Sequence, residues 1–206
     1  MKNILIFVIC LTSLAVSGQD VEAAFDGKNW PPPYTLATPA GWDVERFLIP
    51  IGFAPQIPYK GVEDIRFTPG WAKVTTDDYW SYTFLWYLDS LPQMGEQVIQ
   101  TNLQAYYTGL VEINKGAYKI PEEKIFPAKA IIKKTKTTKG DHETYSGTIE
   151  MLDYMEQKPL ILNCLIHVRP YKEKGKTVIF HELSPKAFSH KIWLSLNKLW
   201  ADFEYK

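Results

Sequence analysis

Cysteine is scarce in this chain, and so are long apolar runs. The 206 residues contain two cysteines, and the first, Cys10, lies within an N-terminal apolar segment. Cys164 is then the only cysteine in the remainder, so we expect no internal disulfide and infer that a packed core provides the stability. After the N-terminal segment no apolar run approaches about 18 residues, so we expect no transmembrane helix.

The chain also has no excess of charge and no motif for catalysis. Lysine and arginine number 23, as do aspartate and glutamate, and this balance argues against a nucleic-acid-binding protein. Ser146-Gly147 lacks the flanking glycine of a nucleophile elbow, and His181-Glu182 is not followed by a second histidine at helical spacing. We therefore predict no catalytic residue and no cofactor.

The N-terminus has the pattern of a signal peptide. Lys2 precedes an apolar run over residues 4–16 that is too short to span a bilayer, and Val16-Ser17-Gly18 places small residues at a cleavage site. We expect residues 1–18 to be removed and the mature protein to be exported. The short, lysine-led form favours a bacterial protein of the periplasm or the extracellular space.

Residues 19–70 are rich in proline and also contain several aromatic residues. Proline interrupts helices and sheet ladders, whereas a disordered linker is poor in aromatic residues. We expect an ordered arm that wraps over the domain, with at most short strands near residues 42–50 and 61–67. The remaining residues, 71–206, are long enough for one domain with its own core.

The periodicity of this second part predicts an α+β fold. Residues 79–88 alternate as in a strand, and a helix with one apolar stripe should follow and end at Asn114. Turn residues then separate four further strands, and an amphipathic helix ends the chain. We predict one antiparallel sheet with both helices packed on one face. The four expected strands form a meander over residues 128–138, 142–154, 160–170 and 177–183.

The last predicted hairpin brings two histidines together. A three-residue turn over residues 173–175 would place His167 opposite His181 and Arg169 beside them, on the face away from the helices and from Cys164. The pair could hold a metal with Glu150 as a third ligand. The alternative is a partly solvated pair without a role, which we favour because two histidines without a fixed-spacing motif are a weak signal. We assign no metal.

Two further features of the sequence concern binding. The chain has 7 Trp, 12 Tyr and 10 Phe, and such residues fill cores but also line sites for sugars and small molecules. The turns of the meander bring several lysines to one end of the sheet, where they form either an anion-binding rim or ordinary solvated loops. The candidate ligand-binding residues are Tyr79, Tyr87, His167, Arg169 and His181.

These observations favour an exported, non-catalytic binding or accessory protein. Its expected ligand is a small apolar molecule or a glycan, and we expect no nucleic-acid partner. An alternative is an enzyme, such as a hydrolase, that uses the pair His167 and His181 with or without a metal. A third hypothesis is a structural subunit that buries the N-terminal arm against a partner. The sequence indicates no particular oligomeric state.

Overall fold

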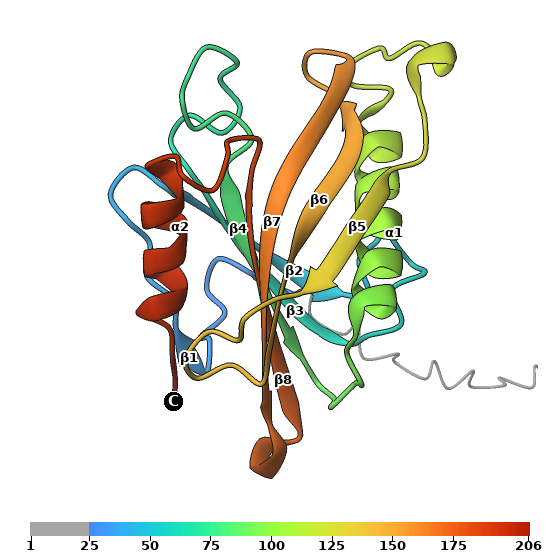
Figure 1. The fold of residues 1–206 in the computed structure, drawn as a ribbon. Coiled ribbons are helices and arrows are strands. Elements are labelled where there is room, and N and C mark those ends of the chain that lie inside the picture. The colour runs from blue at the N-terminus through green and yellow to red at the C-terminus, as the bar shows by residue number, and fades with distance from the viewer. Residues whose placement is uncertain (1–24) are drawn as a thin grey trace, which may run out of the picture.

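The computed structural model describes residues 25–206 and is built around one antiparallel sheet of seven strands (Figure 1). The predicted signal peptide lies outside the described residues. The strand order in the sheet is β2-β3-β4-β8-β7-β6-β5, and the short strands β1 and β9 pair separately. The strands are β1 (Tyr34–Thr35), β2 (Asp43–Ile49), β3 (Gly61–Phe67), β4 (Tyr82–Leu88), β5 (Lys129–Lys134), β6 (Glu143–Asp153), β7 (Lys158–Tyr171), β8 (Lys176–Ser184) and β9 (Glu204–Tyr205).

Two α-helices accompany the sheet, which confirms an α+β fold. Helix α1 (Glu96–Asn114) follows β4 and ends at the predicted residue. Helix α2 (Ile192–Ala201) follows β8, where an amphipathic helix was predicted. Single 3-10 turns, Glu122–Lys124 and Lys172–Lys174, lie in the connections. Among the described residues, no helix has the length and apolar character needed to cross a bilayer.

The predicted four-strand meander is present as β5-β6-β7-β8, and β4 pairs with β8 at its inner end. Strands β2 and β3 extend the sheet on the other side of β4. Both lie near residues 42–50 and 61–67, where we expected at most short strands. This part of the proline-rich segment is therefore part of the sheet and does not only cover it.

The helices lie on opposite faces of the sheet, and the prediction that both cover one face is wrong (Figure 1). Strand β4 explains why, because its side chains are buried on both faces. Phe84 and Trp86 point into a core shared with α1, whereas Leu85 and Tyr87 point into a second core shared with α2. A strand that is apolar on both sides needs a separate apolar layer on each side.

The last hairpin is longer by one residue than predicted. Tyr171 pairs with Lys176, so the turn contains four residues, and Gly175 within it has a φ of 63°. His167 therefore pairs with Phe180, and His181 pairs with Ile166. Because side chains alternate along a strand, this one-residue shift moves His181 to the opposite face from His167.

Helix α1 makes a close backbone contact with the loop after β2. A Cβ atom placed on Gly109 would lie 1.8 Å from the carbonyl oxygen of Phe53, so only glycine allows this approach. The contact holds Phe53 in a T-shaped arrangement with Tyr106 of α1, with ring centroids 5.1 Å apart. The loop and the helix thereby form one wall of a cavity described below.

The Gly109→Ala variant should push this loop away from α1 and destabilise the protein. We expect a loss of about 1–3 kcal/mol in the free energy of unfolding, as for other overpacked sites. The measurement is urea denaturation followed by circular dichroism. Gly116→Ala is the control, because a Cβ there would meet nothing within 4 Å. Equal stability of the two variants would contradict the contact.

Candidate functional site

The two predicted site histidines lie on opposite faces of the sheet. His181 is on the α1 side, stacked on Phe84 with ring centroids 4.0 Å apart, and its Nδ1 donates to the carbonyl oxygen of Phe84 at 3.3 Å. His167 is on the α2 side, 5.1 Å from the ring of Trp200. The predicted cross-strand pair is therefore wrong, and the two imidazoles cannot share a metal ion.

His167 instead belongs to a buried network of charged groups. Its Nδ1 lies 2.7 Å from Asp141 Oδ2 and its Nε2 lies 3.1 Å from Glu182 Oε1. Arg169 Nε donates to Asp141 Oδ1 at 2.9 Å, and the guanidinium lies 3.8 Å from the centre of the Trp200 ring. Two basic and two acidic side chains thus contact one another on the α2 side of the sheet.

The pKa values of His167 and Asp141 shift in the directions that these contacts favour, whereas that of Glu182 follows its burial. Burial would lower the pKa of His167, but its hydrogen bonds to Asp141 and Glu182 outweigh burial and raise that pKa. Burial would raise the pKa of Asp141, but hydrogen bonds from His167, Thr144 and Arg169 lower it overall. Burial raises the pKa of Glu182. The hydrogen bonds to the two carboxyl groups therefore favour the cationic form of the imidazole.

Predicted Glu150 is not part of this network. Glu150 pairs with Lys129 of β5 and with Ile161 of β7. It points to the same face of the sheet as His167, but Ile161 is six residues away from that histidine along β7. The carboxylates that do contact His167 were missed in the sequence. Phe180 pairs with His167, and Glu182 lies two residues further along β8 and so points to the same face. A prediction with the correct turn length would therefore have placed Glu182 near His167. Asp141 lies in a loop, where no periodicity could place it.

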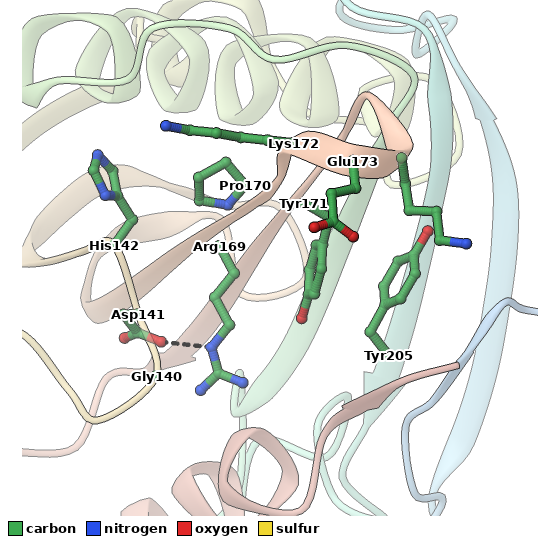
Figure 2. A pocket seen from close by; sticks show the side chains of 10 residues that line it. Gly140, Asp141, His142, Arg169, Pro170, Tyr171, Lys172, Glu173 and Tyr205 are labelled. Atoms are coloured by element: carbon green, nitrogen blue, oxygen red, sulfur yellow. Dashed lines mark hydrogen bonds and ion pairs between the residues drawn. The ribbon is translucent and has the colours of Figure 1, made fainter.

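A surface pocket of about 640 Å³ lies beside this network (Figure 2). The loop at Gly140–His142 forms one side and the turn after β7 forms another, so the two turns do meet at one end of the sheet as expected. Figure 2 shows the Arg169 side chain turned toward Asp141, whereas Lys172 extends away from it. The cations do not converge on one point, and this arrangement is typical of solvated loops.

The predicted aromatic residues Tyr79 and Tyr87 do not share a site. The hydroxyl of Tyr79 donates to Asp153 Oδ2 at 2.6 Å, and its ring packs against the α1-side core. Tyr87 belongs to the α2-side core, where its hydroxyl lies 3.0 Å from that of Tyr205. Whether either residue contacts a ligand stays a prediction.

The structure contains a cavity of about 310 Å³ that the sequence did not predict. It lies between α1 and the half of the sheet formed by β2, β3 and β4. Nine of the thirteen residues that line it are aromatic. The aromatic residues are Phe47, Phe53, Phe67, Trp71, Trp80, Tyr82, Tyr106, Tyr118 and Tyr154, and the others are Glu45, Ile65, Leu110 and Asn114.

The rings of this aromatic cavity hold one another in fixed orientations. Trp80 makes T-shaped contacts with Trp71 and with Tyr154, at centroid distances of 6.1 and 5.2 Å. Phe67 stacks on Trp71 at 4.4 Å. Perpendicular and stacked pairs are the favoured geometries of aromatic rings. The cavity is therefore lined by rings that are inclined to one another in several directions.

Most of the polar groups behind these rings are already hydrogen-bonded. The hydroxyl of Tyr106 donates to Glu63 Oε1 at 2.7 Å, and Trp86 Nε1 donates to Glu63 Oε2 at 3.0 Å. The hydroxyls of Tyr82 and Tyr107 lie 2.6 Å apart. Burial raises the pKa of Glu63 to about 8, although both of its donors act to lower it.

The Asp141→Asn variant should strongly destabilise the protein, because it removes the anion that His167 and Arg169 share. We expect a loss of about 3 kcal/mol in the free energy of unfolding, the range for breaking a buried ion pair. Asp89→Asn is the control, since its ion pair with Lys176 is partly exposed and is expected to contribute less than about 1 kcal/mol. Urea denaturation measures both. Similar losses in the two variants would show that the network is not a buried electrostatic unit.

The His181→Leu variant should reduce the loss of stability in acid. Burial lowers the pKa of His181 to about 3, so between pH 6.5 and that value the unfolded chain binds a proton that the folded chain does not. Wild type should therefore lose about 1.4 kcal/mol per pH unit relative to the variant as the pH falls below 6.5. Denaturation midpoints at pH 7, 6, 5 and 4.5 give this slope. A difference between the two proteins that does not change with pH would contradict a buried, neutral His181.

No protein-family model, curated protein or solved structure matches this chain. Within residues 25–206, no group of three or more histidine, cysteine, aspartate or glutamate side chains is arranged to hold a metal ion.

Proposed function

We propose that this protein binds a small, largely apolar organic molecule in the aromatic cavity between α1 and the sheet. The observation that carries the proposal is the composition of the lining, in which nine of thirteen residues are aromatic. Ligand sites are typically preformed, mostly apolar hollows of about 300–1,000 Å³ with few polar groups. This cavity has a volume in that range and a mostly apolar lining.

The polarity of the lining favours an apolar ligand over a glycan. A sugar needs several hydrogen-bonding partners at fixed positions. Of the side chains that line the cavity, Tyr82 and Tyr106 already use their hydroxyls behind the wall, in contacts with Tyr107 and Glu63. Their ring surfaces are what remains for a ligand, and apolar contact is the interaction that such surfaces provide.

The reactive side chains of the described chain favour binding over catalysis. Both ring nitrogens of His167 are engaged by carboxylates, and His181 is enclosed by Phe84 and Trp86. Burial raises the pKa of Cys164 to about 12, which disfavours its thiolate. The hypothesis of an enzyme built on paired histidines loses its geometric basis, because that pair does not form.

The cellular location belongs to the same proposal. The N-terminal pattern around Lys2 and Val16-Ser17-Gly18 supports export. A protein without a disulfide that works outside the cytoplasm depends on its core for stability, and the two aromatic cores here are extensive. We propose a binding or accessory role in the bacterial envelope or the extracellular space.

Filling the cavity should abolish binding. Leu110→Trp places a large ring in the cavity from α1, whereas Ile113→Trp adds the same ring on the exposed side of that helix. A panel of indole, p-cresol, benzyl alcohol and benzyltrimethylammonium is titrated by calorimetry into wild type and both variants. We expect wild type to bind at least one probe, Leu110→Trp to bind it at least tenfold more weakly, and Ile113→Trp to match wild type.

Two results would contradict the proposed site. One is that no probe binds to wild type, and the other is that Leu110→Trp binds as well as Ile113→Trp does. Circular dichroism of both variants establishes that each is folded, so that a loss of binding reports on the cavity.

A further inference from the structure

The charge of the aromatic cavity has one sign. Glu45 of β2 is exposed at the cavity, and the lining contains no lysine, arginine or histidine. The charge of Glu45 also acts on Tyr154 of the lining and on Glu63 behind it, since it raises the pKa of both. A ligand in this cavity therefore experiences a negative potential from its one charged wall residue.

The aromatic rings that line the same cavity also carry negative charge, on their faces. An aromatic ring has a negative face and a positive edge, and a cation within about 6 Å of the face is attracted to it. The T-shaped pairs formed by Trp80 with Trp71 and with Tyr154 set neighbouring faces at steep angles, 87° and 75°. Faces set at steep angles can contact a single group from more than one side.

A buried residue behind the rings also makes the lining of the cavity more electron-rich. Tyr106 lines the cavity and donates its hydroxyl hydrogen to the fully buried Glu63. Hydrogen bonds in series polarise one another, so a phenol that donates to a carboxyl group presents a more electron-rich ring. Phe53 and Phe84, which contact Tyr106 at centroid distances of 5.1 Å, hold that ring in place.

From these three observations we infer that the ligand of the cavity is an organic cation that carries N-alkyl groups, such as a quaternary ammonium compound. Alkyl groups spread the positive charge over an apolar surface that ring faces can contact, and they need no hydrogen-bond acceptors. Anionic ligands such as fatty acids are repelled by Glu45. The inference rests on the proposed binding function and narrows it to one ligand class.

Choline and 3,3-dimethylbutan-1-ol test the inference directly. The two molecules have the same shape, but the alcohol has an uncharged carbon in place of the ammonium nitrogen. We expect wild type to bind choline roughly tenfold more tightly than the alcohol in calorimetry at low salt. The preference should weaken as salt is raised, because Glu45 is exposed to solvent.

Removal of the Glu45 charge should weaken the binding of choline but not that of the uncharged alcohol. Glu45→Gln should weaken choline binding by about fivefold and leave the alcohol unchanged. Glu112→Gln is the matched control, because it makes the same chemical change on the exposed side of α1 and outside the cavity lining. Leu110→Trp should remove binding of both compounds, which places them in the cavity.

The outcomes separate this inference from the proposed function. Equal affinity for choline and the alcohol, or an equal effect of Glu45→Gln and Glu112→Gln on choline, would overturn the cation preference and leave apolar binding in place. If choline does not bind and a neutral probe such as indole does, the cation preference is likewise overturned and apolar binding stays in place. Failure of choline and of every neutral probe would overturn both.

Discussion

The burial of the two central strands on both faces is the constraint that organises this protein. In β4, Phe84 and Trp86 point to one side and Leu85 and Tyr87 to the other, and all four are buried. Neighbouring β8 is buried along nearly its whole length. Each face therefore needs its own apolar cover, which α1 provides on one side and α2 with residues near Tyr34 provides on the other.

The two covers have different consequences for chemistry. Helix α2 closes its side with a charged network in which Asp141 joins Trp200 of the helix to His167 and Arg169 of β7. Such a network fixes the packing of the helix and leaves its histidine fully engaged. Helix α1 packs mainly against β5 and β6 at one end of the sheet. Strands β4, β3 and β2 form the other end. The aromatic cavity lies on those three strands, and it is there that we propose a ligand binds.

Much of the architecture follows from patterns within short stretches of the sequence. Alternation over β4, the turn residues of the meander and the stop of α1 at Asn114 are local properties, and each was predicted near its observed place. The site was predicted less well. His167 and Arg169 do share one face, but α2 covers that face, so the prediction that it faces away from the helices is wrong. His181 lies on the other face, because a turn of four residues instead of three reverses the face of every residue in the following strand. The position of Glu182 beside His167 depends on that same register, whereas Asp141 comes from a loop.

The sequence by itself determined the kinds of element, their order and the strongly aromatic composition, since these depend on neighbouring residues and on hydrophobic periodicity. Only the tertiary structure decided which faces the helices cover and which residues meet. The cavity joins Glu45, Phe67, Tyr106 and Tyr154, which come from separate segments of the chain. No local pattern encodes such a meeting, because it depends on strand order across the sheet and on the close approach of a loop to α1 at Gly109.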